Sequence, residues 1–546
     1  MVARFIYDYE DCVTRRWAHL LLFGSTFVAA CNGCRPSKTA ETQKPTLRLY
    51  LVSNMAGALE PCGCVKDQLG GLDHVAALMT QQKKNAPDSV FVSAGPTFFL
   101  DPSIKEERKS QEKTKAETIA EVIKGLDFVG LAPGRNDWAL GEATLGDLEA
   151  RSGGQALACN AKPPSGSSGI LHSSLVKEID GVKVGFIGVA QPDKFDIGAP
   201  ITTTFASPAD AVKTEVAALK AKGAQVLVAI AAVGRGEAKR IADVSPDLTA
   251  IVVGATGMNG EENTDAPPPE LVGDVLVAET SNHLQTVGAL DLFVRNDSYK
   301  FQDGTGIAQG QKRKELDRRI DELHGKIADW EKDPKIRTGD LEARRADLRK
   351  VESERKALDE TPPPKEGSFF KYTVLEVREA LGTDPSVQQQ FRAYYKKVDE
   401  TNKVAFADRM PPPAPPNGDS YAGIDACVSC HPGPKAVWDK TPHARAYATI
   451  ADQFKEFNLD CVSCHVTGYE QPGGSSVTHV EKLKNVQCEV CHGPSSKHVA
   501  DATHVKPPIP RPGAENCTTC HHPPHVHSFD ASAKLPEILG VGHGYK

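Results

Sequence analysis

The sequence lacks the features that nucleic-acid binding or a disulfide scaffold would require. Its 546 residues carry 71 acidic and 64 basic side chains, a formal net charge of -7, whereas nucleic-acid-binding domains present a basic face. Aromatic residues make up only 6% of the chain, which argues against surfaces that stack on bases. Its 14 cysteines are too few for a disulfide scaffold of this length. No nucleic-acid partner is expected, and the length predicts about three or four domains.

The first 30 residues have the features of an export signal. Arg15 and Arg16 precede a short apolar stretch, which does not reach the roughly 20 apolar residues that a membrane-spanning helix needs. The stretch ends in Val28–Cys31, and small residues before a cysteine resemble a bacterial lipobox. That resemblance implies lipidation of Cys31 and a periplasm-facing or outer-membrane lipoprotein, with residues 31–45 as the tether. An ordinary signal peptide with an unrelated cysteine is the alternative.

Four Cys-x-x-Cys-His motifs dominate the C-terminal region. Two thiols at this spacing add to the two vinyl groups of one haem, and the adjacent histidine becomes the proximal iron ligand. A zinc site does not need a histidine after each of four cysteine pairs. Four covalently attached haem c groups are therefore predicted. The attachment cysteines are Cys427 and Cys430, Cys461 and Cys464, Cys488 and Cys491, and Cys517 and Cys520, followed by His431, His465, His492 and His521.

The histidines are concentrated in the same region. Twelve of the 17 lie after residue 420, so eight remain as candidate distal ligands once four are proximal. The region from 419 to 546 contains little apolar sequence, and proline and glycine interrupt it throughout. We expect haem to supply most of its interior and the haem-free region to be largely unfolded.

The flanking residues of these motifs resemble the tetrahaem cytochrome c-554 family from Tyr421 to about His543. By this resemblance His443 and His498 are distal iron ligands, and His525 and His543 match later histidines of the family. One haem in that family can lack a protein distal ligand, so a five-coordinate iron and complete bis-histidine ligation both stay open. His479, His504, His522 and His527 are expected at the surface or beside ligands. The resemblance is carried by Cys427–Pro432, Trp438–Ala446, Cys461–Tyr469, Pro472–Gly474 and Val486–His498.

Residues 46–300 alternate short apolar runs with helical patterns. Such runs, bounded by turn residues, are typical of buried strands, and their alternation with helices predicts a mixed α/β layered domain. The expected strands are Leu47–Ser53, Ser89–Ala94, Lys183–Val189, Gln225–Ala231, Leu248–Gly254 and Asp274–Glu279. The expected helices are Gly71–Lys84, Gln111–Lys124 and Pro208–Lys222.

This domain resembles the calcineurin-like metallophosphoesterases of the 5′-nucleotidase branch, but the metal ligands of that family are missing. The resemblance is carried by Asn54–Leu72, Val92–Thr97, Gly125–Asp137, Lys183–Gly188, Ile251–Gly257 and Gly288–Leu292. A two-metal hydrolase needs Asp, His and Asn ligands. Their places are taken by Asn54–Gly57, Gly95–Pro96, Ala132–Asp137, Ala232–Val233 and Gly254–Gly257. We interpret the domain as catalytically inactive; a relocated site using Asp73, His74, Asp101, Asp137 or His283 is the alternative.

Three further cysteines lie in this domain. Cys62 and Cys64 are separated by one residue, a spacing that rarely permits a disulfide between them. A disulfide to Cys159 is the first expectation, and metal binding or reduced thiols near a haem are the alternatives.

The middle of the chain is predicted to be helical and hinged. Apolar residues from Leu316 to Trp330 are spaced 4, 3, 4 and 3 residues apart, which is a heptad pattern, and a second such run follows a Pro/Gly break. An α-helical hairpin over 309–360 is favoured over a coiled coil between two molecules. A connecting strand and helix over 365–408 and a proline-rich linker over 409–418 complete the chain.

Together these features predict a multidomain protein: a metallophosphoesterase-like α/β layered domain, a helical hairpin and a mainly α or irregular multihaem cytochrome c domain. The leading hypothesis is electron transfer between periplasmic or membrane redox partner proteins, with the lipid anchor at a membrane and the inactive domain used for docking or sensing. The alternatives are a haem enzyme that acts on small nitrogen or sulfur compounds at a five-coordinate haem, and a metal-dependent phosphoesterase.

Overall fold

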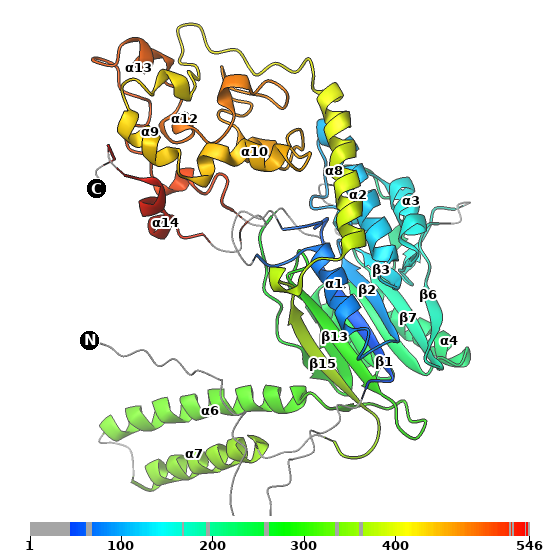
Figure 1. Ribbon diagram of the computed structural model, residues 1–546. Coiled ribbons are helices and arrows are strands. Elements are labelled where there is room, and N and C mark those ends of the chain that lie inside the picture. The colour runs from blue at the N-terminus through cyan, green and yellow to red at the C-terminus, as the bar shows by residue number, and fades with distance from the viewer. Residues whose placement is uncertain are drawn as a thin grey trace, which may run out of the picture. The chain divides into compact units, whose positions relative to one another are not determined.

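Two β-sheets stacked face to face form the centre of the α/β domain in the computed structural model (Figure 1). The structure describes residues 44–61, 68–165, 169–192, 197–255, 261–333, 338–359, 364–522, 526, 529–540 and 542–543. The first sheet has the order β14 (Gln302–Asp303), β15 (Phe369–Glu376), β13 (Thr286–Phe293), β1 (Leu47–Ser53), β2 (Ser89–Gly95), β3 (Phe128–Pro133) and β4 (Gln155–Ala156). The second has the order β11 (Glu270–Val272), β12 (Val275–Ala278), β10 (Ala250–Gly254), β9 (Val226–Ala232), β7 (Val182–Ala190) and β6 (Ser174–Ile179).

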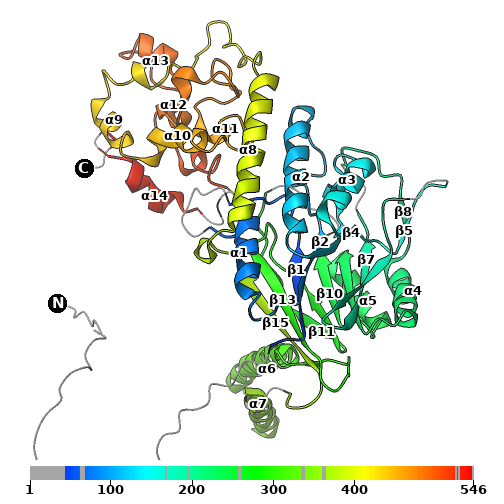
Figure 2. The ribbon, with the colours of Figure 1, turned by 45° about the vertical axis from the view of Figure 1, so that its right-hand side comes forward.

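Helices cover the outer faces of both sheets (Figure 2). The first sheet packs against α1 (Leu72–Gln82), α2 (Lys109–Lys124), α3 (Glu142–Ser152) and α8 (Pro385–Ala405). The second packs against α4 (Pro208–Ala221) and α5 (Arg235–Val244). A short pair, β5 (Ala161–Lys162) and β8 (Thr204–Phe205), lies apart from both sheets. The predicted α/β layered domain is therefore confirmed as four layers.

The apolar runs of the sequence follow from burial on both faces of each sheet. Leu49 and Leu51 of β1 contribute to the core between the sheets, whereas Tyr50 and Val52 contribute to the core under the helices. All four are fully buried. Strands buried on both faces are almost continuously apolar rather than alternating, which is why they could be predicted. β3 and β13 are not among the expected strands; glycine and a proline or aspartate interrupt their apolar runs.

Residues 365–408 belong to the α/β domain rather than only connecting two others. β15 pairs with β13 along its whole length, from Phe293 opposite Phe369 to Thr286 opposite Glu376. α8 buries Phe391, Tyr394 and Val398, which complete the core beneath α1 and α2.

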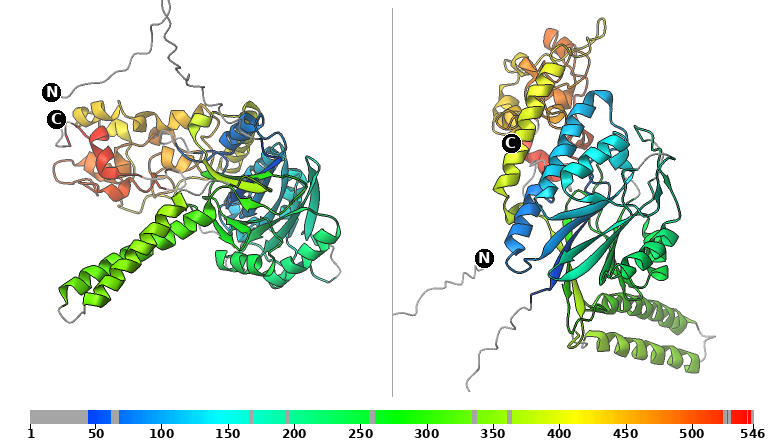
Figure 3. Two further views of the ribbon diagram at one scale, coloured as in Figure 1. Left: turned by 90° about the horizontal axis from the view of Figure 1, so that it is seen from below. Right: turned by 90° about the vertical axis from the view of Figure 1, so that its right-hand side faces the viewer.

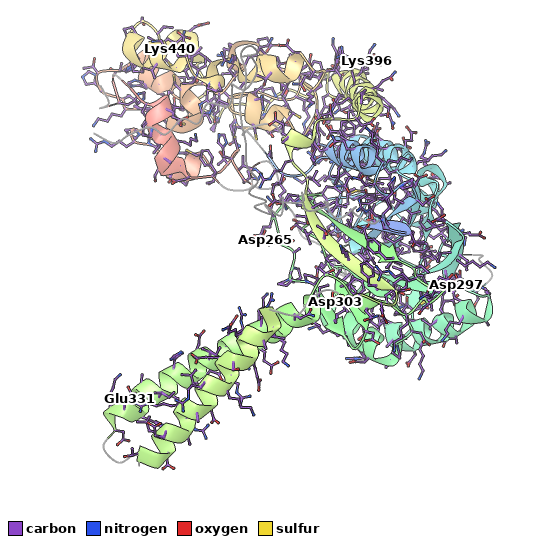
Figure 4. The ribbon with its side chains drawn as sticks, turned by 60° about the horizontal axis from the view of Figure 1, so that its bottom comes forward. Asp265, Asp297, Asp303, Glu331, Lys396 and Lys440 are labelled. Atoms are coloured by element: carbon purple, nitrogen blue, oxygen red, sulfur yellow. The ribbon has the colours of Figure 1, made fainter. Side chains whose placement is uncertain are left out.

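The helical hairpin consists of α6 (Ile307–Lys332) and α7 (Thr338–Asp359), which lie side by side (Figure 3). Leu316, Leu323 and Val351 form its apolar contact. Arg355 pairs with Asp317 at 2.7 Å and Arg345 with Glu331 at 2.7 Å, so the helices run antiparallel. Figure 4 labels Glu331 near the far end of the hairpin and Asp303 at its base. Asp303 accepts hydrogen bonds from the backbone N–H groups of Thr305, Gly306 and Ala308 and so fixes the start of α6.

Where it is described, the C-terminal region contains only short helices separated by turns. They are α9 (Pro432–Trp438), α10 (Ala446–Ala451), α11 (Val462–His465), α12 (Cys488–His492), α13 (Ser496–Ala500) and α14 (Ala531–Ile538). Its apolar clusters in the described residues are small: Phe406, Leu459 and Val477, and Val462, Val466 and Val480. Buried polar side chains hold its loops instead. Glu489 accepts hydrogen bonds from the backbone N–H groups of Ala422, Gly423 and Ser495. Over the part of the chain that is described, no helix is long and apolar enough to span a membrane.

Candidate haem sites

Each Cys-x-x-Cys-His motif lies on a helical turn. The second motif overlaps α11 and the third coincides with α12. In the first and fourth, the N–H of His431 donates to the carbonyl of Cys427 at 3.0 Å and that of His521 to the carbonyl of Cys517 at 2.9 Å. Residues three apart lie on one side of a helical turn, so the two thiols of each motif can reach one haem while the next residue turns toward its iron.

Three histidine pairs bring a motif histidine opposite one from elsewhere in the chain. The ring centres of His431 and His498 are 6.3 Å apart, those of His443 and His521 are 6.4 Å apart, and those of His492 and His543 are 6.2 Å apart. Imidazole nitrogens bind transition metals at about 2 Å. A single metal between two coaxial imidazoles therefore separates the ring centres by about 6 Å, which is the spacing that the three pairs share.

Hydrogen bonds orient several of these rings. The Nδ1 atoms of His465, His492 and His498 lie 2.6, 2.9 and 2.6 Å from the carbonyls of Ala446, Ile509 and Val505. A carbonyl can only accept, so each Nδ1 donates and leaves Nε2 unprotonated and available to a metal. His521 stacks on Phe529 with ring centres 4.3 Å apart. Burial lowers the pKa of His443 and of His521, which favours the neutral imidazole that binds metals.

The ligand set fits haem better than a metal ion held by protein alone. Within the described residues, no group of three or more His, Cys, Asp or Glu side chains is placed to hold a metal ion. Structural zinc requires four protein ligands. A porphyrin supplies four nitrogens and leaves two axial positions, and paired imidazoles beside paired thiols match that requirement.

Thiols of different motifs lie close to one another. Cys427 of the first motif is in hydrogen-bond contact with Cys488 of the third, and Cys464 of the second with Cys520 of the fourth. Burial, together with the nearby thiol of Cys517, raises the pKa of Cys491 to about 11, so the third motif also adjoins the fourth. These approaches link the first motif to the third, the third to the fourth and the fourth to the second.

The second motif differs from the others. Among the described residues, no histidine ring is in contact with His465. His525, the remaining candidate distal ligand, and His527 lie outside the described residues.

The other histidines of this region have different neighbours. Nδ1 of His479 lies 3.1 Å from the hydroxyl of Thr478. His504 is exposed and lies 2.9 Å from Asp501. His522 lies 2.8 Å from Glu261 of the α/β domain.

The positions where the phosphoesterases hold metals meet at one edge of the stacked sheets. β1, β2 and β3 are parallel to one another, as are β9 and β10, so their carboxyl ends lie together. Here the Oδ1 of Asn54 accepts a hydrogen bond from the N–H of Ala255 at 2.7 Å. A Cβ at Gly95 would lie 2.4 Å from that oxygen, and one at Gly254 would lie 2.1 Å from the carbonyl of Ala94. In its described part, this edge is filled by the Asn54 side chain and by backbone segments in close contact.

The acidic residue left at this edge has a structural role. Asp137 accepts hydrogen bonds from the N–H groups of Thr97 at 2.9 Å, Phe98 at 2.8 Å and Gly134 at 3.0 Å. Burial raises the pKa of Asp137 to about 7, against the effect of these donors. Its oxygens therefore hold two loops together.

The residues suggested for a relocated site do not form one cluster in the described chain. Asp73 accepts a hydrogen bond from Gln388 at 2.6 Å, and His74 donates to the carbonyl of Gly382 at 2.6 Å, so both fasten α1 to the segment around α8. Burial lowers the pKa of His283 to about 4, and Asp101 is exposed.

Cys159 lines a cavity of about 300 Å³ beside Asn160 and Ser207. Burial raises the pKa of its thiol to about 12, which disfavours the thiolate form. Cys62 and Cys64, the suggested disulfide partners, and the predicted lipidation site Cys31 lie outside the described residues.

Residues 426–493, which include the first three motifs, match the family model described as cytochrome c554 and c-prime. Over 97 residues the chain is 32% identical to cytochrome c-554 of Nitrosomonas europaea, an alignment that covers 15% of this chain and 41% of that protein. The chain thus spans less than half the length of this curated relative. The predicted resemblance to the cytochrome c-554 family is confirmed over residues 426–493, and we refer to residues 419–546 as the cytochrome region.

Several solved structures are similar to the chain at low identity. A 5′-nucleotidase precursor from Thermus thermophilus is 16% identical with a TM-score of 0.43, covering 67% of this chain and 61% of that one. Sulfate thiohydrolase SoxB from Thermus thermophilus is 12% identical with a TM-score of 0.42, covering 73% and 68%. Calcineurin-like phosphoesterase YfkN from Bacillus subtilis is 16% identical with a TM-score of 0.37, covering 46% and 86%.

Proposed function

We propose that this protein is an exported cytochrome with four covalently attached haem c groups that transfers electrons between redox partner proteins. The observation that carries the proposal is the set of three histidine pairs with ring centres 6.2 to 6.4 Å apart, each joining a motif histidine to a distant one. Haem iron, when bound, accepts and releases one electron at a potential that its ligands and surroundings set.

The paired histidines serve as axial ligands in this proposal. His431 and His498, His492 and His543, and His521 and His443 would occupy both axial positions of three haems. Two imidazoles leave no axial position for a substrate, which suits electron transfer rather than catalysis. The carbonyls of Ile509 and Val505 accept from Nδ1 of His492 and His498 and hold these two rings in place, so little reorganisation would accompany a change of charge there.

The proximity of the motifs suits a conduit. Electrons would pass along the three approaches between thiols, from the first motif through the third and fourth to the second. Electrons would therefore be exchanged with periplasmic or membrane partners near the first and second motifs.

The α/β domain would serve as a docking and supporting module rather than as a phosphoesterase. Its candidate metal edge is filled by the contacts of Asn54, Gly95 and Gly254. A lipid on Cys31 would attach the chain to a membrane facing the periplasm. Manganese should accordingly support no turnover of a generic phosphomonoester, and metal-dependent turnover would contradict this role.

Removal of one distal ligand tests the assignment. His498→Ala should convert one haem from low spin to high spin in the electron paramagnetic resonance spectrum of the oxidised protein. His504→Ala, an exposed histidine beside Asp501, is the matched control and should leave the spectrum unchanged. A low-spin spectrum for His498→Ala would contradict the pairing, and peptide mass spectrometry would count the attached haems.

A haem enzyme is the second candidate, because one haem of the resembling cytochrome c-554 family can lack a protein distal ligand and the three histidine pairs do not include His465. An open iron at that motif could bind a small nitrogen or sulfur compound. The wild-type protein would then show a high-spin fraction that a small ligand such as cyanide converts to low spin. A wholly low-spin wild-type spectrum would eliminate this candidate.

A further inference from the structure

The segment before the second motif is held by the α/β domain. Gln111 of α2 accepts a hydrogen bond from the N–H of Leu459 at 2.9 Å, and Asn402 of α8 donates to the carbonyl of Phe457 at 2.9 Å. Gln111 and Asn402 are also bonded to each other at 2.9 Å. Both are almost fully buried, so this contact is a built interface between α2, α8 and the cytochrome region.

A four-charge network lies at the centre of this interface. Asp460 pairs with Arg108 and with Lys115, the latter at 3.2 Å. Glu112 pairs with the same two cations, at 3.1 Å from Arg108 and 2.9 Å from Lys115. Burial opposes the ionisation of Asp460, but Lys115 and Arg108 outweigh it and hold its pKa well below the usual range. The two negative and two positive side chains of this network therefore have a net charge of zero.

Asp460 immediately precedes Cys461, the first attachment cysteine of the second motif. Consecutive Cα atoms are about 3.8 Å apart, so the network adjoins the site of that haem. The loop before the first motif is held differently: Glu489 and Gln487, which bind Ala422, Gly423 and Ile424, belong to the cytochrome region itself. The second motif thus receives charged neighbours from another domain.

We infer that Arg108 and Lys115 of the α/β domain, acting with Glu112 and Asp460, set the redox potential of the haem attached at Cys461 and Cys464. This rests on the proposed function and adds a role for the inactive domain. A cation near a haem favours the reduced state and an anion favours the oxidised state. Loss of one member of the balanced network therefore exposes the uncompensated charge of the others.

The test compares two variants of opposite charge in the full-length holoprotein. Lys115→Met should lower the reduction potential of one haem, and Asp460→Asn should raise the potential of the same haem. Each change should alter the oxidised-to-reduced ratio of that haem at a fixed applied potential by about tenfold. For a one-electron couple that is about 59 mV. Spectroelectrochemical titration measures the shifts. Glu106→Gln is the control, because Glu106 pairs at 2.7 Å with Lys109 near the start of α2 but is exposed.

Shifts of opposite sign confined to one couple would support the inference, because a merely structural disturbance would move both variants in the same direction. The inference would be overturned if both variants shifted the potential in the same direction, or if their shifts were no larger than that of Glu106→Gln. Peptide mass spectrometry separates this failure from failure of the proposed function. Unmodified thiols at Cys461 and Cys464 would overturn both, whereas attached haem with unchanged couples would overturn the inference alone. If Asp460→Asn does not fold, Arg108→Gln and Lys115→Met must both lower the couple.

Discussion

The α/β domain and the cytochrome region are stabilised by different means within one chain. In the α/β domain, strands such as β1 and β9 are buried along their whole length, and apolar side chains fill the space between all four layers. The described part of the cytochrome region has apolar clusters of only three buried residues each, and polar side chains such as Glu489 hold its loops. One region folds by burying its own apolar surface, whereas we expect the other to depend on attached haem.

The largest effect is expected when haem attachment is abolished. Replacing all eight motif cysteines by serine should remove the thermal transition of the cytochrome region, because too little apolar surface remains to offset the loss of conformational entropy. The transition of the α/β domain should persist. Differential scanning calorimetry distinguishes the two, with Cys159→Ser as the control. Two intact transitions in the haem-free protein would show that the cytochrome region, like the α/β domain, folds without haem.

A matched pair of leucine truncations compares the two interiors. Leu51→Ala should lower the free energy of unfolding by about 4 kcal/mol, because Leu51 lies between the sheets and the cavity left there cannot collapse. Leu483→Ala in the cytochrome region should cost about 2 kcal/mol. Both side chains are buried, at 0% and 3% exposure. A difference between the two costs would therefore come from the packing around each side chain and not from its exposure. Chemical denaturation measures both values, and equal costs would contradict the comparison.

Loss of the charged contact between the two regions should have an intermediate effect on stability. Asp460→Asn should lower the free energy of unfolding at pH 7 by about 2 kcal/mol, a value between those of exposed and buried ion pairs, since the Asp460 side chain is 29% exposed.

The same variant predicts a pH dependence. The pKa of Asp460 in the folded protein is below its value in the unfolded chain, so its contribution is complete above about pH 4 and is lost as the pH falls. The stabilities of wild type and Asp460→Asn should therefore converge in acid, where Arg108, Lys115 and Glu112 still face the site. A difference that does not change with pH would show that charge is not its cause.

Glu489→Gln examines the polar support within the cytochrome region. Glu489 is 3% exposed and accepts three backbone hydrogen bonds, whereas a glutamine amide nitrogen cannot accept. We expect a loss of about 1.5 kcal/mol in stability of the holoprotein. The exposed Glu481→Gln should have no effect, and an equal loss in both variants would indicate that burial of Glu489 is unimportant.

The smallest effect is expected at a helix end in the α/β domain. Asp384 accepts hydrogen bonds from the N–H groups of Ser386 at 2.9 Å and Val387 at 3.3 Å at the start of α8. Asp384→Ala should cost about 1 kcal/mol, and Asp384→Ser should restore most of it. A loss as large as that of Leu51→Ala would mean that local hydrogen bonds, rather than the apolar core, dominate this domain.

The sequence by itself determined the haem-attachment motifs, several buried strands and the start of one helix, because each depends on neighbouring residues only. The Cys-x-x-Cys-His spacing is itself the requirement for attaching haem, so these motifs can be recognised in the sequence without knowing the fold. The apolar runs of β1, β9 and β10 likewise predict buried strands, and Asp384 followed by Pro385 predicts the start of α8.

Only the tertiary structure decided which distant residues meet. The pairing of His431 with His498 and of His492 with His543 depends on how loops cross between motifs, which no spacing in the chain encodes. The placement of β15 beside β13 depends on a partner some 80 residues earlier in the chain. The contact of Arg108 and Lys115 with Asp460 is likewise invisible in the sequence, because surface charges on a helix select their partners only when two domains come together.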